Sequence, residues 1–324
     1  MADDDVPAPL LPRAATRALE LMECWAAVCA PQQVNPLVRI VAAALRQPEL
    51  AHLKRVHRGS GGERPAELLV LLWRAEDADL AARPGSDLDV KLRAHELRRQ
   101  VVAVPRHAPL TRAQFDAWRE HWPLVFHESA AAHALSRWAT PATLAERPAM
   151  VRHMRAAVAV ARDARRAGGH GVGALIVRPA ADGASDDEVL AVCADGTCDD
   201  GHPLHHAVMR CIEAVADAQR RAAASVPGGS KRAAPGGGDG DDKCGYLCTG
   251  CDAYVTVEPC AMCAMALLHS RIRRVAYALE APDGALGSLY EVHAHAGLNH
   301  HFQVFRAMLR DEAVRGLGLQ RCVL

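Results

Sequence analysis

The chain has 324 residues, of which 50% are hydrophobic and 23% are charged, and this composition excludes wholesale disorder. Its 38 Lys and Arg side chains balance 38 Asp and Glu side chains, so no global charge attracts it to nucleic acid or to a membrane surface. No apolar run approaches the roughly 20 residues that span a bilayer, and the acidic start Met1–Asp5 lacks the basic beginning of a secretory signal. We therefore expect a soluble intracellular protein of about two domains.

Residues 1–145 form the first predicted domain, a small α+β unit in which strand and helix patterns alternate. The predicted elements are strands over 68–73 and 101–104 and helices over 48–57 and 112–120. Pro48 suits the first turn of a helix. Thr111 followed by Gln114 is typical of a capping box, in which each side chain bonds the backbone of the other residue.

Residues 146–324 form the second predicted domain, with a sharper pattern. The predicted elements are helices over 150–167, 205–221 and 260–272, and strands over 172–177, 189–194, 254–257 and 274–279. Strands that are joined through helices imply parallel pairs with helices packed on the sheet, so this domain is α/β. The low-complexity segment 222–242 is expected to be a disordered insertion.

A metal site is indicated where cysteines and histidines gather. Cys260 and Cys263 lie three residues apart in the first turn of a predicted helix, where free N–H groups and the helix dipole favour thiolates. His206 stands at the start of the preceding helix. One imidazole and two thiolates make a tetrahedral zinc site with an open fourth position. We therefore expect His206, Cys260 and Cys263 to bind Zn²⁺.

A rival interpretation combines the pair Cys248 and Cys251 with Cys260 and Cys263 in a four-cysteine zinc site. The eight residues between the two pairs are fewer than the usual spacing of about 15–20. The strand predicted over 254–257 would also hold the pairs apart, which disfavours this interpretation.

The order of these motifs carries a resemblance to a known family. His206-Ala207, then a strand, then Pro259-Cys260-Ala261-Met262-Cys263 is similar to the zinc nucleobase deaminases, whose signature is His-x-Glu followed by Pro-Cys-x-x-Cys. The chain resembles the cytidine/deoxycytidylate deaminase superfamily, and within it the tRNA adenosine deaminases that make inosine at the anticodon wobble position. The further residues that carry the resemblance are Tyr246-Leu247-Cys248, Val257-Glu258, Ala264 to Arg271, Asp283 to Gly287 and Leu298 to Phe305.

The last of these motifs and the first domain resemble the non-catalytic subunit of the eukaryotic heterodimeric enzyme. The resemblance implies a cytidine-deaminase-like mixed sheet with helices on both faces, preceded by a small α+β domain that positions tRNA. It also implies a catalytic deaminase subunit as partner, and residence in the cytoplasm and the nucleus.

One residue departs from the family pattern. Val208 occupies the third position of His-x-Glu, where a glutamate shuttles protons between the zinc-bound water and the base. Valine carries no proton, and Glu213 lies more than a helical turn further on. We therefore predict a pseudo-enzyme with no catalytic residue of its own and a structural zinc. Its fourth ligand is water, Cys248, Cys251, Cys322 or the carboxylate of Leu324.

Two basic runs are candidate RNA contacts. Lys91 to Arg112 contains one acid, Glu96, and the basic residues Lys91, Arg93, Arg98, Arg99, Arg106 and Arg112. Arg152 to Arg178 contains six arginines and one acid, Asp163. Phosphate contacts carry most nucleic-acid affinity, although such runs also occur as solvated surfaces. We expect RNA contacts in the first run.

Two other functions stay open at this point. One is an active nucleoside or nucleotide deaminase that uses an unrecognised acid. The other is a zinc-stabilised RNA- or protein-binding module without a deaminase partner. An assay of the purified chain alone and identification of its tightest partner separate the three hypotheses.

Overall fold

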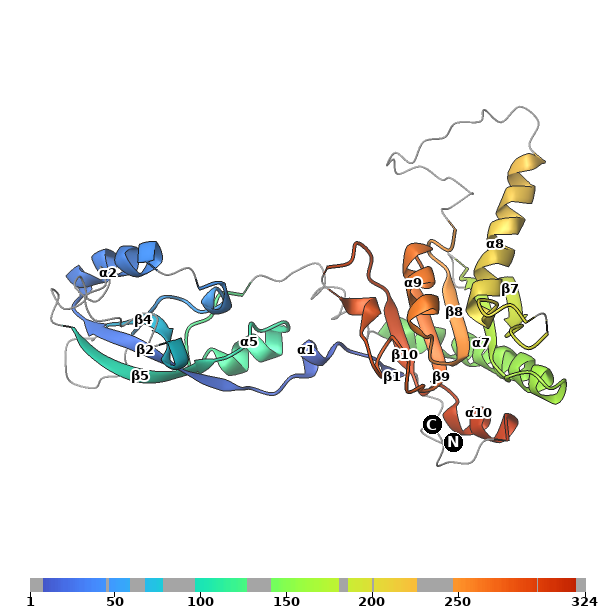
Figure 1. The fold of residues 1–324 in the computed structure, drawn as a ribbon, viewed down its shortest axis with the longest axis horizontal. Coiled ribbons are helices and arrows are strands. Elements are labelled where there is room, and N and C mark those ends of the chain that lie inside the picture. Colours follow the sequence, from blue (N-terminus) through green and yellow to red (C-terminus); the bar gives the residue numbers. More distant parts are fainter. Residues whose placement is uncertain are drawn as a thin grey trace. The chain divides into compact units, whose positions relative to one another are not determined.

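The structure is a computed structural model that describes residues 8–44, 47–58, 68–77, 97–126, 141–180, 186–199, 201–225, 247–295 and 297–318. The chain divides into two units (Figure 1). The N-terminal unit is Arg13–His133, and the C-terminal unit is Ala134–Leu324 together with Met1–Pro12.

The N-terminal unit is built on a four-stranded antiparallel sheet in the order β3-β4-β2-β5. Its elements are α1 (Arg13–Thr16), β2 (Leu21–Cys29), α2 (Pro31–Ala44), η2 (Pro48–Leu50), β3 (Val56–Arg58), β4 (Leu68–Arg74), η3 (Ala75–Asp77), β5 (Arg98–Pro105) and α5 (Arg112–Trp118). On one face of β4, Leu71 packs in a cluster with Trp122, and on the other Val70 packs with Leu37 of α2. Burial on both faces explains why β4 is apolar along nearly its whole length.

Three of the elements predicted in this unit are confirmed as β4, β5 and α5. The capping box at the start of α5 is present. The Thr111 hydroxyl accepts the Gln114 N–H at 3.2 Å, and Oε1 of Gln114 accepts the Thr111 N–H at 3.1 Å. These two bonds satisfy backbone donors that the helix itself leaves unpaired.

The helix predicted over 48–57 is wrong. Only a single 3-10 turn forms at Pro48–Leu50, and the chain then enters β3, where Val56 pairs with Val70. The proline favours a first helical turn, but pairing with an apolar strand that is distant in sequence decides the conformation of the rest.

The C-terminal unit is built on a six-stranded mixed sheet in the order β1-β10-β9-β8-β6-β7. Strands β8, β9 and β10 run parallel, and β1, β6 and β7 pair antiparallel. Its elements are β1 (Ala8–Pro9), α7 (Pro141–Arg166), β6 (Gly173–Arg178), β7 (Glu188–Ala194), α8 (Ala207–Ala224), β8 (Asp252–Val257), α9 (Ala261–His269), β9 (Arg274–Leu279), η4 (Val292–Ala294), β10 (Gln303–Arg306) and α10 (Arg310–Gly316).

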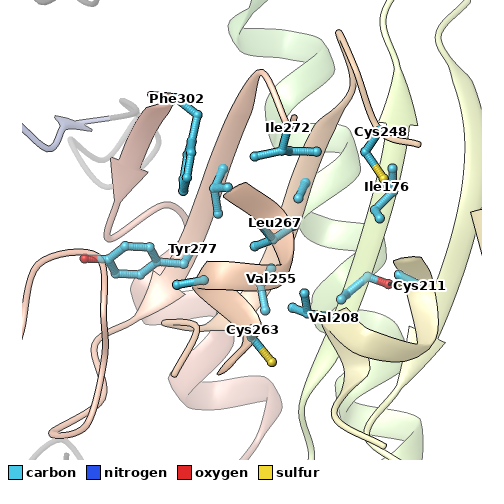
Figure 2. Packing of buried hydrophobic residues seen from close by; sticks show 14 of the residues in the cluster. Ile176, Val208, Cys211, Cys248, Val255, Cys263, Leu267, Ile272, Tyr277 and Phe302 are labelled. Atoms are coloured by element: carbon cyan, nitrogen blue, oxygen red, sulfur yellow. Dashed lines mark hydrogen bonds between the residues drawn. The ribbon is translucent and has the colours of Figure 1, made fainter. Parts of the chain in front are cut away.

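Two apolar clusters cover the two faces of this sheet. One joins the sheet to α8 and α9 through Cys211 and Leu267, and the other joins it to α7 and α10 through Met154 and Ala313. The central strand β9 is buried at every position. The expected mixed sheet with helices on both faces is therefore confirmed, and the first cluster, drawn in Figure 2, includes Val208 and Cys263.

The division of the chain differs from the expected 1–145 and 146–324 at its ends. Ala8 and Pro9 pair with Arg306 and Phe305 of β10, so the start of the chain belongs to the C-terminal unit. Helix α7 begins at Pro141, earlier than the predicted start at residue 150. A two-residue strand has no periodicity of its own, and only its distant partner defines it.

The helices on either side of the segment 222–242 have shifted ends. Helix α8 continues to Ala224, so the start of that segment is helical, and residues 226–246 lie outside the described residues. Helix α9 ends at His269, before the predicted end at residue 272, because Arg271 adopts φ +61° and leaves the helical conformation. Within the described residues, no helix is both long and apolar enough to cross a membrane.

Candidate metal centre

The structure brings His206, Cys260 and Cys263 together. Nδ1 of His206 lies 3.7 Å from Sγ of Cys260 and 3.6 Å from Sγ of Cys263. Tetrahedral zinc with Zn–S near 2.3 Å and Zn–N near 2.0 Å requires ligand separations of roughly 3.5–3.8 Å. The donor atoms and their spacing therefore fit zinc. Among the described residues, this is the one group of three or more potential ligands that lie within 4.8 Å of one another.

Helix starts position the ligands. His206 is the N-cap of α8 and Cys260 is the N-cap of α9, and both have extended backbone conformations. Cys263 lies one turn further into α9, on the same face as Cys260. Because α9 follows the carboxyl end of β8, the sheet presents the thiols at the end of a parallel strand, where α/β proteins commonly place their sites.

The two thiols differ in acidity. The hydrogen bond from Cys263 lowers the pKa of Cys260 to about 5, with further help from the N–H groups of Cys263 and Met262 and from His206, although burial opposes the shift. The same hydrogen bond, together with burial, raises the pKa of Cys263. Because the two thiols share one hydrogen bond, Cys260 ionises readily and Cys263 does not. A bound cation favours ionisation of Cys263 as well.

The four-cysteine alternative does not form in the described part of the chain. Cys248 and Cys251 are buried in the apolar cluster, and the N–H of Cys248 donates to the carbonyl of Ser270, at the end of α9 opposite the thiol of Cys260. Figure 2 shows Cys248 beside Ile176 and Ile272, away from Cys263. Burial raises the pKa of Cys248 to about 12, which opposes metal binding. Cys322 and Leu324 lie outside the described residues.

A cavity of about 400 Å³ opens at the metal centre, and Val208 is part of its wall. Val208 is only 4% exposed and lies in the first turn of α8, beside His206. Figure 2 shows its side chain next to Val255 and Cys263. The position at which an active relative needs a carboxylate therefore carries an apolar wall, and Glu213 is exposed and does not line the cavity.

Three carboxylates line the cavity, those of Glu258, Asp195 and Asp283, and two of them accept hydrogen bonds from nearby residues. Glu258 is buried and accepts the N–H groups of Leu286 at 3.0 Å, Gly287 at 2.7 Å and Ser288 at 3.1 Å. Asp195 accepts the N–H and the hydroxyl of Thr197. Asp283 is exposed. The sequence predicts no role for Glu258 beyond its place in a motif, although its position directly before Pro259-Cys260 places it beside the site.

The basic residues predicted to contact RNA are only partly described. Lys91 and Arg93 lie outside the described residues. Arg98 and Arg99 lie on the edge strand β5, with the guanidinium of Arg99 5.9 Å from the ring centre of Trp73. Arg106 is exposed directly after β5. The described members therefore follow one edge of the N-terminal sheet.

The second basic run, Arg152 to Arg178, is partly neutralised. Three of its arginines pair with acids outside the run, in Arg152–Asp186, Arg155–Glu312 and Arg178–Glu188. Arg162 and Arg166 both contact Asp163, which belongs to the run itself. The excess positive charge in the folded unit is therefore smaller than the sequence count suggests.

Comparison with known proteins assigns both units. Residues 149–279 match the cytidine and deoxycytidylate deaminase zinc-binding region, and residues 22–122 match the tRNA-specific adenosine deaminase TAD3 N-terminal domain. A probable inactive tRNA-specific adenosine deaminase-like protein 3 of Rattus norvegicus is 40% identical over 333 residues, which cover 94% of this chain and 89% of that protein. The Homo sapiens protein of that name is 40% identical over 327 residues, covering 94% and 90%. The tRNA-specific adenosine deaminase subunit tad3 of Schizosaccharomyces pombe is 28% identical over 295 residues, covering 90% and 85%.

Proposed function

Because this chain belongs to the family of tRNA-specific adenosine deaminase-like protein 3, or TAD3, we propose that it is the non-catalytic, zinc-binding subunit of a tRNA-specific adenosine deaminase. In this role it supports a catalytic partner that converts adenosine to inosine at the anticodon wobble position, and it helps to bind tRNA. One observation carries the proposal: the cavity keeps His206, Cys260 and Cys263 but has Val208 in place of the proton-transferring carboxylate.

The residues around the cavity favour a structural role for the metal. Zinc, when bound, supplies a link between its three ligands and part of the folding free energy. His206 holds the start of α8 and Cys260 the start of α9, so the ligands join the two helices that cover one sheet face. Deamination also needs a group that moves protons to the base and to the leaving ammonia. Val208 lines the cavity with an apolar side chain and transfers no proton.

An apolar surface beside α9 is the proposed contact with the catalytic partner. Met265 is exposed on α9, and Leu289 and Tyr290 are each more than half exposed in the segment before η4, which packs on α9. Large apolar side chains that gather at a surface mark interaction sites. The Schizosaccharomyces pombe relative is named a subunit, and we assign this surface to a homologous catalytic chain that carries the missing glutamate.

The edge strand β5 of the N-terminal unit is the proposed tRNA contact, through Arg98, Arg99 and Arg106 with Lys91 and Arg93. Arg98 and Arg106 are exposed, and guanidinium groups at a sheet edge suit a phosphate backbone. Replacement of Arg106 by Gln should weaken tRNA binding by the complex. It should also reduce the slope of log K against log salt concentration by about the amount expected for one phosphate contact. The exchange Arg310→Gln in the C-terminal unit serves as the matched control. Equal effects of the two exchanges would contradict this assignment.

Reconstitution tests the proposed function. The purified chain alone should produce no inosine in tRNA or from free nucleosides, whereas the complex with its catalytic homologue should be active. Activity of the partner alone, equal to that of the complex, would refute the supporting role, and deamination by this chain alone would refute its non-catalytic assignment. We also propose residence in the cytoplasm and the nucleus, which imaging of the tagged full chain in cells tests.

A further inference from the structure

A second cavity in the C-terminal unit lies at the other end of α9 from the metal centre. Its volume is about 570 Å³, and it lies between the turn 268–271 and the loop 297–300. The nine residues of α9, at about 1.5 Å of rise each, place this cavity roughly 13 Å along the helix from Cys260. It is therefore separate from the metal centre.

Two hydrogen bonds fix the shape of this cavity. Nη1 of Arg271 donates to the carbonyl of Asn299 at 3.2 Å, and Nε2 of His300 lies 2.7 Å from the carbonyl of Ile272. Because a carbonyl only accepts, Nε2 of His300 carries the proton. The turn and the loop are thus joined in both directions, and the bond from His300 holds the loop against the turn.

Backbone capping explains the conformation of Arg271 and makes no use of its side chain. The N–H of Arg271 donates to the carbonyl of Leu268 at 3.0 Å, and the N–H of Ile272 donates to the carbonyl of Leu267 at 3.2 Å. With φ +61° at Arg271, these two bonds form a Schellman motif that ends α9. The guanidinium has no part in this cap, and the turn places it beside the cavity.

The charge around this cavity has one sign. The segments 268–273 and 295–301 contain two arginines, four histidines and no carboxylate. The buried carboxylate of Asp252 pairs with Arg273 at 2.7 Å, which leaves Arg271 as the permanent charge that faces the cavity. His269, Asn299 and His300 line it as well, and the side chains of His269 and Asn299 can each donate a hydrogen bond.

We propose that this cavity binds a phosphate group, with Arg271 as the charged anchor, His269 and Asn299 as hydrogen-bond donors, and His300 holding the loop in place. Arginine is suited to this task because its planar guanidinium presents several N–H groups, of which the bond to Asn299 uses one. An RNA backbone and a small phosphorylated molecule offer the same chemistry. The site goes beyond the proposed function, which assigns tRNA to the N-terminal unit.

Titration of the full chain, with its histidine rings isotopically labelled, tests the site by NMR at constant ionic strength. The probes are inorganic phosphate, adenosine monophosphate and a short oligoribonucleotide. Phosphate should shift the ring signals of His269 and His300, identified by their Gln variants, and leave the signal of His170 at the metal cavity unchanged. The variant Arg271→Gln should weaken phosphate binding about tenfold, as expected for one charge-assisted contact. The exchange Arg315→Gln, at an exposed arginine of α10, should leave it unchanged.

The three probes distinguish the possible sources of the phosphate group. Binding of the oligoribonucleotide that competes with phosphate identifies an RNA backbone as the source, whereas binding of only the small probes identifies a small phosphorylated molecule. The variant Arg271→Lys keeps the charge and should retain most of the affinity, so it replaces Arg271→Gln if that variant unfolds. The proposal is overturned if no probe shifts either ring, or if Arg271→Gln and Arg315→Gln bind phosphate equally well. None of these arms uses the catalytic partner, so they are independent of the reconstitution test.

Discussion

The carboxylate of Glu258 fills the space that a side chain at Gly284 would occupy, because a Cβ built there would lie 2.2 Å from Cδ of Glu258. Gly284 also pairs with Cys260 in a β-bridge, and the N–H of Ala285 donates to the carbonyl of Pro259 at 2.9 Å. Glu258 in turn accepts the N–H groups that follow in the same turn, as described above. A buried carboxylate therefore gathers residues 281–288 against the cysteine that begins α9.

Gly284→Ala should destabilise the C-terminal unit by about 2 kcal/mol, since the methyl group overlaps a carboxylate that its hydrogen bonds hold in place. The zinc content of the purified chain should fall with it. Thermal unfolding followed by circular dichroism and metal analysis measure both. Gly316→Ala is the control. Gly316 lies in helix α10, and a Cβ there would lie 3.3 Å from Val158. Because alanine has a higher helix propensity than glycine, stability should be unchanged or slightly higher. Equal stability of the two variants would contradict the role given to Glu258.

Removal of the metal should destabilise the C-terminal unit alone. Cys260→Ala or thorough chelation removes a link between α8 and α9, at an expected cost of several kcal/mol. Four of the five tryptophans, Trp25, Trp73, Trp118 and Trp122, lie in the N-terminal unit, so with Trp138 replaced by Phe tryptophan fluorescence reports on that unit while circular dichroism follows both. The exposed Cys198, replaced by Ser, is the control. Unchanged thermal stability after chelation would show that the metal does not contribute to folding.

The parts of the fold that were predictable are those determined by neighbouring residues. The strand over 274–279 has the predicted bounds, because an apolar run ends at charged residues on both sides. The capping box of α5 depends on two residues three apart. The ligands Cys260 and Cys263 could be predicted as neighbours for the same reason, and His206 was predicted from its position at the start of the preceding helix.

The parts that were not predictable depend on distant partners. β1 is a strand because it pairs with β10. β3 forms in place of a predicted helix because it pairs with β4. Three acids that pair with the basic run 152–178, Asp186, Glu188 and Glu312, lie outside the run, and the charge count along the sequence did not include them. The hydrogen bonds from the turn 281–288 to Glu258 likewise depend on where the end of β8 meets that turn in the fold. The spacing of residues along the chain does not predict that contact.

Acid should weaken the attachment of α7 to the β6–β7 hairpin. The buried Nε2 of His153 lies 2.8 Å from the carboxylate of Asp187. Burial acts to raise the pKa of Asp187, but the hydrogen bond from His153 and the N–H of Ala180 outweigh it, so the pKa lies below the ordinary 3.8. A lowered folded-state pKa means that this stabilisation is present above about pH 4 and is lost as the pH falls further.

Asp187→Asn should therefore reduce stability at neutral pH and flatten its decline below pH 4, as measured by urea unfolding over pH 2–7. Asp186→Asn is the matched control, because the Asp186 side chain is 98% exposed and its single ion pair, with Arg152, is long at 3.8 Å. Identical pH profiles for Asp187→Asn and the unaltered chain would contradict this assignment.

Deletion of Gly228–Gly240 should leave folding and the activity of the complex nearly unchanged. The cost of closing a loop varies only logarithmically with its length, and this Gly-rich composition is a poor core former. The flanking residues are held independently, since Nε2 of Gln219 donates to the carbonyl of Leu247 at 2.6 Å. Thermal unfolding and tRNA titration of the complex test this. A large loss of tRNA affinity would identify the segment as a binding arm.

Restoration of the family's carboxylate by Val208→Glu should not create an active subunit. The new side chain would supply a proton shuttle, but catalysis also needs an open metal position and a cavity that accepts the base. Val208 is 4% exposed, so a glutamate without a hydrogen-bond partner there should cost about 1–3 kcal/mol of stability. The assay is inosine formation in tRNA by the complex in which the partner's own catalytic glutamate is disabled. Val208→Gln is the matched control, with nearly the same shape and no exchangeable acid. Turnover by the Glu variant and not by the Gln variant would mean that the cavity is intact and lacks only its acid, and the structural assignment of the zinc would then be wrong, although the assignment to the non-catalytic family would stand.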